Sequence, residues 1–434
     1  MSRLVYNGLL RIFKPLIFSY LKNKKKQRGR DFDMHHPERF GLYPADRPRI
    51  YAPVWIHAVS LGETRACQPL VRLLLDNGFP VLLTHMTDTG RAQGAKLFSE
   101  DIAKGSLVQA WIPYDFPDAV NGFFAHWKPR CGVLIEREVW PNLVYTAKQL
   151  NIPMVLVSAR FSEKSAKFVN SLGGVLKDSY KSLNLILSQS FLDNKHFESI
   201  GISSQVTGNL KFDLDIPEDQ IELGKETKKQ LNRQVVVIAS TRDGEEQMFI
   251  KDIIQIKKEN PVAQNPLYVI IPRHPERFAE VEHLLKKSPL TFARRTDNPQ
   301  ADSLNSIDVL FGDTMGELFF YYGLADCSIV AGSFGDFGGQ NHIEACAAGV
   351  PVIVGPHTQN FEKSVDDAII EGVARRAENT YQALTLANTL LSQPDQLSVM
   401  ARTAKQWLAL HQGVSKRIFD YLLPFISDKK RIES

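Results

Sequence analysis

A chain of 434 residues is too long for one ordinary hydrophobic core, so its length favours two domains. Hydrophobic residues at 44% and charged residues at 23% are typical of a folded soluble protein and exclude a disordered one. The net charge of +4 is local: the first 30 residues hold nine Lys and Arg and no acid, which leaves 43 basic against 48 acidic side chains. This distribution argues against a general nucleic-acid binder and for an N-terminal segment that meets an anionic surface.

The N-terminal segment is apolar over residues 4–21, but Asn7, Arg11, Lys14 and Pro15 interrupt it. A spanning helix needs about 20 apolar residues, so two cations near the middle argue against one. A cleavable signal fits poorly because the basic run follows the apolar stretch. We expect a short helix in the inner face of a membrane; a disordered basic tail is the alternative. The cations expected on anionic headgroups are Lys22, Lys24, Lys25, Lys26, Arg28 and Arg30.

From Val54 onward, short apolar runs alternate with helical lengths in the order of a parallel, doubly wound α/β sheet. The alternation lapses into a charged stretch and then resumes at VVVIAS, which predicts two Rossmann-like domains facing across a cleft. The expected divisions are a membrane-associating segment (1–30), an N-terminal domain (31–208), a connection (209–233) and a C-terminal domain (234–434).

The stretch HAVSLGETRA, residues 57–66, carries the first candidate for chemistry. Its predicted strand ends at Val59, and Glu63 falls at the start of the helix that follows. A carboxylate on such a turn has few rotamer options and could act as a general base. The alternative is an acid that only stabilises the helix dipole.

The stretch LIEREVWPNL places Glu136 and Glu138 after a second apolar strand. Along an extended chain the two acids point to one side and Arg137 to the other. They could be structural ion-pair members, yet the carboxyl end of a central strand is where ligand sites form in this architecture. Lys211, in GNLKFD beside the domain junction, could pair with an acidic substrate or with developing negative charge; a solvated surface lysine is the alternative.

Residues 326–362 are predicted as strand, glycine-rich turn, helix, strand and second turn. The glycines free the backbone to approach a ligand, and Asn341 can cap the helix that follows. Glu344 lies three residues further on, on the same side of that helix. Backbone N–H groups and the positive helix end suit a phosphate, and a carboxylate accepts from ribose hydroxyls. A glycine-rich connection without a ligand is the alternative.

Two further loops follow apolar strands in the second half of the chain. Arg273 and His274, in IPRHPERF, supply donors for a phosphate. Met315, Gly316 and Glu317, in GDTMGEL, are predicted to begin a helix whose N–H groups could do the same.

Metal sites and disulfides are not expected. Asp213 and Asp215 form an Asp-x-Asp pair, but they lie in the presumed connection and not after a buried strand. The four cysteines are widely separated without a CxxC pair, which favours buried, reduced thiols. The chain contains no HExxH, P-loop or strand-initial GxGxxG motif.

Taken together, these motifs resemble the 3-deoxy-D-manno-octulosonic acid (Kdo) transferases, glycosyltransferases of Gram-negative bacteria that modify lipid A. The resemblance runs in order from the N-terminal segment to about residue 375. It is carried by RFG, WIHAVSLGE, EREVWPN, SARFSEKSA, GNLKFD, PRHPERF, GDTMGEL and GGQNHIEACAAGVPVIVGPHTQNF.

The resemblance implies a GT-B fold and inverting transfer of Kdo from CMP-Kdo to the lipid A precursor, lipid IVA, without a required metal or cofactor. It assigns Glu63 as the base and gives Glu136 and Lys211 a role in stabilising the transition state. It also implies work at the cytoplasmic face of the inner membrane, with anionic lipids and no nucleic acid as partners. The implied CMP-binding positions are Pro272, Arg273, Met315, Gly316, Glu317, Asn341, His342, Ile343 and Glu344.

The chain departs from the family pattern in the glycine-rich stretch. The family often has GGHNPLE, whereas this chain has GGQNHIE, so Gln340 replaces a histidine and His342-Ile343 replaces Pro-Leu. One alternative is another GT-B enzyme that uses a UDP-sugar, such as a lipid A disaccharide synthase or an epimerase. A second is a catalytically silent, membrane-associated binding protein.

Overall fold

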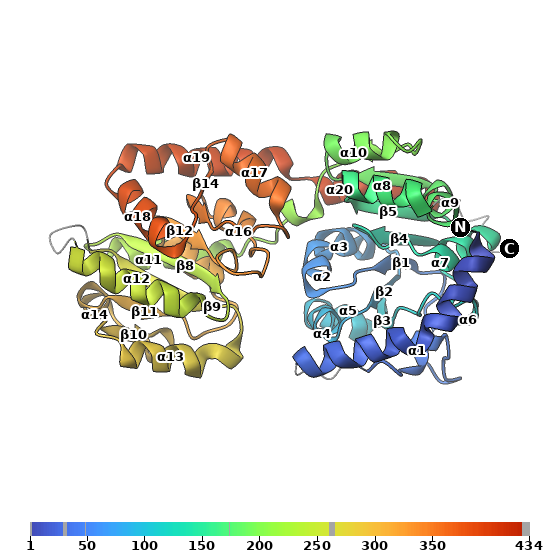
Figure 1. The fold of residues 1–434 in the computed structure, drawn as a ribbon, viewed down its shortest axis with the longest axis horizontal. Coiled ribbons are helices and arrows are strands. Elements are labelled where there is room, and N and C mark those ends of the chain that lie inside the picture. Colours follow the sequence, from blue (N-terminus) through green and yellow to red (C-terminus); the bar gives the residue numbers. More distant parts are fainter. Residues whose placement is uncertain (1, 29–32, 48, 173, 260–264, 428–434) are drawn as a thin grey trace. The chain divides into compact units, whose positions relative to one another are not determined.

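The chain folds into two compact units, seen in a computed structural model that describes residues 2–28, 33–47, 49–172, 174–259 and 265–427 (Figure 1). The first unit comprises Met1–Leu214 and Gly413–Ser434, and the second comprises Asp215–Gln412. Each contains its own seven-stranded sheet, and every strand pairing in both is parallel. The expected α/β fold with two Rossmann-like sheets is therefore confirmed.

The first sheet has the order β3-β2-β1-β4-β5-β6-β7, so β1 and β4 are neighbours although two strands separate them in sequence. The chain builds one half of the sheet after β1 and the other half after β4, which makes this pair the topological switch point. The strands are β1 (Val54–His57), β2 (Val81–His85), β3 (Leu107–Trp111), β4 (Cys131–Ile135), β5 (Met154–Ala159), β6 (Leu185–Ser188) and β7 (Gln205–Val206).

Two buried clusters pack against this sheet, as the alternation of side chains along β1 requires. Trp55 joins one cluster with Phe123 and Trp127, and its neighbours Val54 and Ile56 join the other. The helices of the unit are α1 (Arg3–Arg28), η1 (Pro37–Phe40), α2 (Leu61–Ala66), α3 (Gln68–Asp76), α4 (Asp88–Leu97), α5 (Ser99–Lys104), α6 (Pro117–Trp127), α7 (Pro141–Gln149), α8 (Glu163–Leu172), α9 (Gly174–Lys181), α10 (Phe191–Glu198), η2 (Leu210–Phe212) and α20 (Val414–Ile426).

The second sheet repeats the pattern with the order β10-β11-β9-β8-β12-β13-β14, so its switch point lies between β8 and β12. Its strands are β8 (Val235–Thr241), β9 (Leu267–Pro272), β10 (Phe292–Arg294), β11 (Val309–Phe311), β12 (Cys327–Val330), β13 (Val352–Val354) and β14 (Ala374–Arg376). Its helices are α11 (Glu218–Lys229), α12 (Glu245–Glu259), η3 (Pro275–Arg277), α13 (Phe278–Lys287), η4 (Arg295–Asp297), α14 (Ala301–Ser306), α15 (Leu318–Leu324), α16 (Ile343–Ala347), α17 (Glu362–Ile370), α18 (Thr380–Leu391) and α19 (Pro394–His411).

The C-terminal helix α20 packs in the first unit, whereas the sequence analysis gave all of residues 234–434 to the second domain. Val414, Ile418 and Leu422 join the same buried cluster as Val54. An amphipathic pattern shows that a helix covers a core, but not which of two cores it covers.

The Asp213 carboxylate fixes the start of α20. Its Oδ1 accepts from the Gly413 N–H at 2.7 Å and its Oδ2 accepts from the Ser415 N–H at 2.5 Å. Asp213 therefore satisfies two N–H groups of a helix start, which is the work of a cap. The units divide between Leu214 and Asp215, so the expected connection 209–233 contributes η2 to the first unit and α11 to the second.

Helix α1 packs on the first unit through polar and aromatic side chains. The Tyr6 hydroxyl donates to Asp115 Oδ2 at 2.9 Å, and Asn142 Nδ2 donates to Asn7 Oδ1 at 2.7 Å. Phe18, inside the apolar stretch 4–21 that was expected to lie in the membrane, stacks on His35 with ring centroids 5.6 Å apart.

The other face of α1 is apolar: the exposed fractions of Leu4, Ile12 and Leu16 are 82%, 70% and 63%. Among the described helices, none is long and apolar enough to cross a bilayer. The cations expected on headgroups, from Lys22 to Arg30, lie outside the side chains that the structure describes.

The capping role of Asp213 can be tested by replacing it with alanine. Loss of such a cap costs about 1 kcal/mol, so we expect the amides in the first turn of α20 to exchange hydrogen about fivefold faster. Hydrogen exchange followed by mass spectrometry measures this. Asp215→Ala, two residues away on an exposed side chain, is the matched control, and equal effects of the two variants would contradict the assignment.

Candidate active site

Glu63 lies at the carboxyl end of β1, at the start of α2, where the sequence placed it. Ser60 is the N-cap residue: its Oγ accepts from the Glu63 N–H at 3.4 Å and donates to Glu63 Oε1 at 3.1 Å. Glu63 Oε2 also accepts from the Val59 N–H at 2.8 Å. These reciprocal bonds resemble a capping box and hold the carboxylate over the strand end.

The surroundings of Glu63 raise its pKa to about 7. Burial is the largest cause, since it disfavours the charged form, and the negative charges of Glu136 and Glu138 add to it. The hydrogen bonds from Val59 and Ser60 act in the opposite direction. A carboxylate with a pKa near 7 is a stronger base than an ordinary one and still ionises at physiological pH, as a general base requires.

Glu136 follows β4 in the left-handed backbone region, with φ at +59°. The expectation of an extended chain here is wrong, because the strand ends at Ile135 and the Arg137 N–H turns back onto the Ile135 carbonyl at 2.9 Å. The turn is fixed on both sides: the Glu136 N–H donates to the Val157 carbonyl and the Glu136 carbonyl accepts from the Arg160 N–H, both at 3.1 Å. A non-glycine residue in this region carries backbone strain, which tends to occur at functional sites.

Lys211 reaches Glu136 from η2, far along the chain from β4. Its Nζ lies 2.8 Å from Glu136 Oε1, with side chains 20% and 18% exposed, respectively. Helix α2 contacts η2, the turn that carries Lys211. The structure therefore brings together three predicted residues, because Lys211 pairs with Glu136 and the charge of Glu136 acts on Glu63.

Three polar residues that the sequence analysis did not single out hold this lysine turn. Asn209 Oδ1 accepts from the Lys211 N–H at 3.0 Å, and Ser158 Oγ accepts from the Leu210 N–H at 3.2 Å. Gln189 Nε2 donates to the Ser158 carbonyl at 2.9 Å. Ser158 lies in the motif SARFSEKSA and Asn209 lies in GNLKFD. Their place in these motifs could have identified both as site residues from the sequence.

Glu138 lies in the turn after Glu136 and accepts from Trp140 Nε1 at 2.9 Å. Burial raises its pKa, and its charge contributes to the raised pKa of Glu63. The charges of Glu136 and Glu138 therefore both raise the pKa of Glu63. The prediction that the two acids point to one side assumed an extended chain, which the structure does not have here.

At the switch point of the second sheet, a carboxylate of the chain itself occupies part of the glycine-rich loop. Glu245 is fully buried, and it accepts from the N–H groups of Arg242 (2.8 Å), Gly332 (2.7 Å) and Phe334 (2.9 Å). The sequence analysis assigned N–H groups of this loop to a phosphate. For Gly332 and Phe334 that assignment is corrected, since both donate to Glu245.

The rest of the glycine loop is positioned by the segment that follows β13. Gly338 and Gly339 both have φ at +81°, which side chains rarely adopt. A Cβ on Gly338 would lie 2.7 Å from Asn360 Nδ2, and that nitrogen donates to the Phe337 carbonyl at 3.0 Å. The loop therefore needs glycine both for its backbone and for the close approach of Asn360.

Helix α16 begins at Ile343, and Asn341 Oδ1 accepts from the Ile343 N–H at 3.2 Å, close to the capping role expected for it. The side chains of His342 and Ile343 are fully buried. His342 lies beside Phe361 and Trp407, and burial lowers its pKa to about 4. The expected ligand contacts of His342 and Ile343 are thus limited to their backbone.

The segment 315–317 precedes a helix and does not begin it, because α15 starts at Leu318. Glu317 is the N-cap residue, and its carboxylate lies 3.1 Å from Arg295 Nη2 and accepts from Thr314 Oγ1 at 2.6 Å. The expectation that the helix starts at Met315 is therefore wrong. The three residues still follow the carboxyl end of β11 in the chain.

Pro272 ends β9, and the Arg273 N–H donates to the Thr241 carbonyl at 3.0 Å, which joins the ends of β9 and β8. Arg273 and Glu344 are both partly exposed at this edge of the sheet. Sequence reasoning missed the neighbouring Arg277, which pairs with Glu246 at 3.0 Å and ties PRHPERF to the first turn of α12.

The described residues include no group of three or more His, Cys, Asp or Glu side chains that could hold a metal ion. The sequence analysis considered Asp213 and Asp215 as a metal-binding pair. In the structure, Asp213 caps α20. All four cysteines are buried free thiols, as expected.

Two parallel seven-stranded sheets, each with polar loops at its switch point, define a GT-B-like two-domain fold. A solved glycosyltransferase from Rickettsia africae shares this fold, with a TM-score of 0.55 and 12% identity over 87% of this chain and all of that one. A UDP-GlcNAc 2-epimerase from Neisseria meningitidis does so with a TM-score of 0.52 and 14% identity, covering 86% of this chain and all of that one.

The family model of 3-deoxy-D-manno-octulosonic-acid transferase (kdotransferase) matches residues 34–214. A 3-deoxy-D-manno-octulosonic acid transferase from Bordetella pertussis is 46% identical over 424 residues, 97% of this chain and 99% of the relative. One from Haemophilus influenzae is 31% identical over 439 residues, 98% of this chain and 99% of the relative. The chain belongs to the 3-deoxy-D-manno-octulosonic acid transferase family, a family of glycosyltransferases in lipopolysaccharide biosynthesis, and the resemblance seen in its motifs is confirmed.

The position of Glu245 generates a prediction about the glycine loop. Hydrogen bonds to a charged group are worth about 1.5–3 kcal/mol each, so in Glu245→Ala we expect residues 332–339 to exchange amide hydrogen at least tenfold faster. Asp336→Ala, on an almost fully exposed side chain of the same loop, is the control and should leave the exchange unchanged. Unchanged exchange in Glu245→Ala would contradict the positioning role.

Proposed function

We propose that this Kdo transferase moves Kdo from CMP-Kdo to the lipid A precursor, lipid IVA, with inversion at the anomeric carbon and without a metal-dependent step. The observation that carries this proposal is the group Glu63, Glu136 and Lys211 at the first switch point. It combines a carboxylate whose pKa is raised to about 7 with a partly buried ion pair beside it.

Glu63 acts as the general base in this proposal. It takes the proton of the attacking acceptor hydroxyl while the new C–O bond forms at the anomeric carbon. The bond between that carbon and the phosphate oxygen breaks, and CMP leaves with the electron pair. One displacement of this kind inverts the anomeric centre.

Glu136 and Lys211 stabilise the charges that develop during transfer. Glycosyl transfer passes through an oxocarbenium-like transition state, so a nearby carboxylate favours the positive charge on the ring. The ammonium of Lys211 is a counter-charge for the carboxylate of the sugar acid. A preorganised ion pair offers both charges without reorganisation at the moment of reaction.

The second unit binds CMP at the carboxyl edge of its sheet. Arg273 offers a cation to the phosphate, and Glu344 can accept from ribose hydroxyls. The leaving group carries its own phosphate charge, which an arginine and backbone N–H groups can stabilise. The positions proposed for CMP are Pro272, Arg273, Met315, Gly316, Glu317, Asn341, His342, Ile343 and Glu344, with His342 and Ile343 contributing backbone only.

Helix α1 holds the enzyme on the cytoplasmic face of the inner membrane, where the acceptor lipid resides. Support comes from the direction of its faces: Tyr6 and Asn7 point to the protein, and Leu4, Ile12 and Leu16 are exposed. An apolar helix face of this kind enters the boundary between headgroups and acyl chains, and anionic lipids attract the flanking cations.

The role of Glu63 is tested by Glu63→Gln with CMP-Kdo and lipid IVA, reading the mass of the product. Loss of general-base catalysis costs about 10²- to 10⁴-fold in rate, while CMP affinity should stay unchanged because the base belongs to the other unit. For the wild type we expect kcat/KM to rise about tenfold per pH unit below pH 7 and to level off above, since only ionised Glu63 accepts a proton.

A Gln variant that keeps more than half of the wild-type rate would make Glu63 a structural acid only. Product formed with a UDP-sugar in place of CMP-Kdo would instead support a UDP-sugar enzyme of the same fold.

The role of α1 is tested by the double variant Ile12→Glu/Leu16→Glu. Charged residues on the apolar face should prevent insertion, so cosedimentation with anionic vesicles should fall at least tenfold. Transfer to membrane-embedded acceptor should drop far more than transfer to detergent-dispersed acceptor. The control is Leu410→Glu, on an exposed leucine of α19; an equal loss in both proteins would refute a specific role for α1.

A further inference from the structure

The motif EREVWPN continues past Glu136 and ends at Asn142. The backbone bonds of Glu136 to β5 and Arg160 fix the beginning of the turn that it forms. The end of the turn enters α7, whose N-cap residue Trp140 makes no side-chain capping bond. Since the first helical residue is a proline without an N–H, the first donors of α7 are those of Asn142 and Leu143. Both need an acceptor from another segment.

Asp115, in the loop between β3 and α6, is that acceptor. Its Oδ2 accepts from the Asn142 N–H at 3.0 Å, and its Oδ1 accepts from the Leu143 N–H at 2.9 Å. These are the second and third residues of α7, the positions that an N-cap side chain would bond, and a negative charge also suits the positive end of a helix. Asp115 therefore caps α7 from a distant segment and holds the end of the turn that carries Glu136.

Helix α1 bonds to the same two residues, Asp115 and Asn142. The Tyr6 hydroxyl donates to Asp115 Oδ2 at 2.9 Å. Asn142 Nδ2 donates to Asn7 Oδ1 at 2.7 Å and to the Asp115 carbonyl at 2.6 Å. Burial raises the pKa of Asp115 to about 6, and the bond from Tyr6 opposes this rise because it favours the charged form. Tyr6 therefore helps to keep the cap of α7 ionised.

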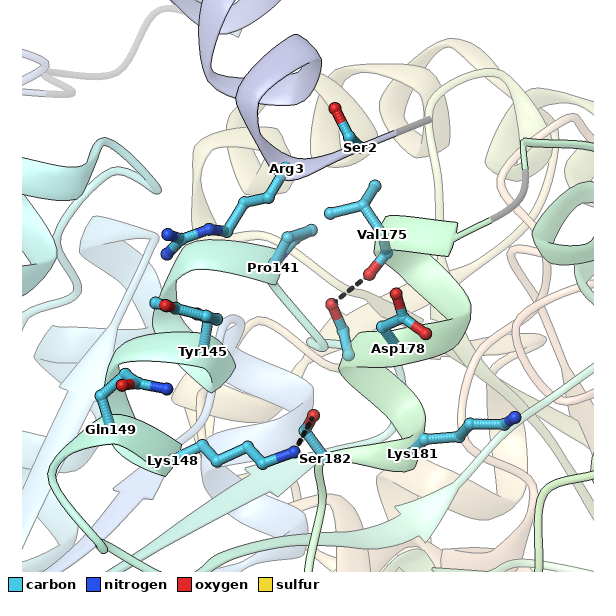
Figure 2. Close-up of a pocket in the computed structure, with 11 residues that line it drawn as sticks. Ser2, Arg3, Pro141, Tyr145, Lys148, Gln149, Val175, Asp178, Lys181 and Ser182 are labelled. Carbon is cyan, nitrogen blue, oxygen red and sulfur yellow. Dashed lines mark hydrogen bonds between the residues drawn. The ribbon is translucent and has the colours of Figure 1, made fainter.

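Few contacts hold α1 in this place. None of its described side chains is buried, so it has no part in the cores of the first unit. At its start, the guanidinium carbon of Arg3 lies 3.2 Å from the centroid of the Tyr145 ring on α7 (Figure 2). A cavity of about 500 Å³ lies beside this contact, between α1, α7 and α9. An element with so few buried contacts opens at a low free energy, so the bonds of Tyr6 and Asn7 matter for its seat.

We propose that Asp115 is a positioning residue for Glu136, and that Tyr6 and Asn7 make this positioning depend on the seat of α1. The inference rests on the proposed catalytic role of Glu136 and adds a conformational coupling between α1 and the catalytic turn. Seated α1 keeps Asp115 bonded and ionised, which holds Glu136 beside Lys211. When α1 leaves, Asp115 loses a donor, the start of α7 loosens, and Glu136 can move away from Lys211.

The proposed membrane contact and the seat of α1 use different faces of the helix. Leu4, Ile12 and Leu16 are exposed, whereas Tyr6 and Asn7 bond to the first unit. Both contacts can therefore form at once, and an enzyme bound to lipid through its apolar face keeps the catalytic turn ordered.

The role of Asp115 is tested by Asp115→Asn in the full chain. The amide keeps the shape but has one acceptor oxygen in place of two, so one of the two N–H groups loses its acceptor. We expect the amides of residues 137–144 to exchange hydrogen at least tenfold faster. With detergent-dispersed acceptor, kcat should fall at least tenfold while the KM for CMP-Kdo stays within twofold. Asp118→Asn, on an exposed side chain at the start of α6, is the control and should match the wild type.

The pH profile of transfer reports the position of Glu136. The charges of Glu136 and Glu138 raise the pKa of Glu63, and they act less strongly if the turn moves away. In Asp115→Asn the rise of kcat/KM should therefore level off at a lower pH than in the wild type. A variant that only destabilises the fold would leave this pH unchanged.

The role of α1 is tested by Tyr6→Phe, which removes one hydroxyl and leaves Asp115 in place. The same amides should exchange at least threefold faster, and kcat with detergent-dispersed acceptor should fall at least threefold. Detergent is used because membrane anchoring does not limit the rate there. Tyr145→Phe keeps its ring beside Arg3 and should match the wild type. Equal results for the two tyrosine variants would overturn the coupling to α1.

Unchanged exchange in Asp115→Asn would overturn the positioning role, and so would faster exchange with the wild-type kcat and pH profile. Wild-type exchange in β1 and β4 shows that the first unit folds; if Asp115→Asn does not fold, Tyr6→Phe decides by the same measurements. If the wild type fails to transfer Kdo, the proposed function fails, whereas the exchange data still decide whether Asp115 and Tyr6 order the turn.

Discussion

The topology of a parallel sheet is the constraint on which the rest of this structure depends. After β1 the chain covers one half of the first sheet and after β4 the other half, so their carboxyl ends leave a gap that no connecting helix fills. Glu63 and Glu136 occupy the two sides of that gap. The second sheet repeats the arrangement at β8 and β12, where Glu245 and the glycine loop meet.

The two switch points use buried carboxylates in different ways. Glu245 accepts from three N–H groups of its own chain, which oppose the rise in its pKa caused by burial, and it orders the backbone of the glycine loop. Glu63 has fewer donors and two acidic neighbours, so its charged form is disfavoured and its pKa is raised. Because the pKa of Glu63 is raised from 4.5 to about 7, folding stability falls as the pH rises from about 4.5 to 7, a cost common to reactive sites.

Sequence reasoning predicted correctly the features that depend on the local pattern of apolar and polar residues. Apolar runs gave the central strands, and the end of the first run placed Glu63 at a helix start. It could not give the left-handed turn at Glu136, since one residue with positive φ leaves the apolar pattern of the strand unchanged. Contacts between distant segments were also invisible: Glu245 bonds Gly332, and α20 returns to the first core.

The polar underside of α1 joins the proposed membrane helix to the proposed catalytic group of the first unit. Asp115 accepts from Tyr6 and also from the N–H groups of Asn142 and Leu143, which open α7 directly after the turn that carries Glu136. In an enzyme whose α1 rests on lipid as proposed, this helix is bonded to the turn that carries Glu136 through the partly buried Asp115 carboxylate and not through a flexible tether. Such an enzyme would work at a fixed height above the surface and would select acceptors whose hydroxyl stands at that height.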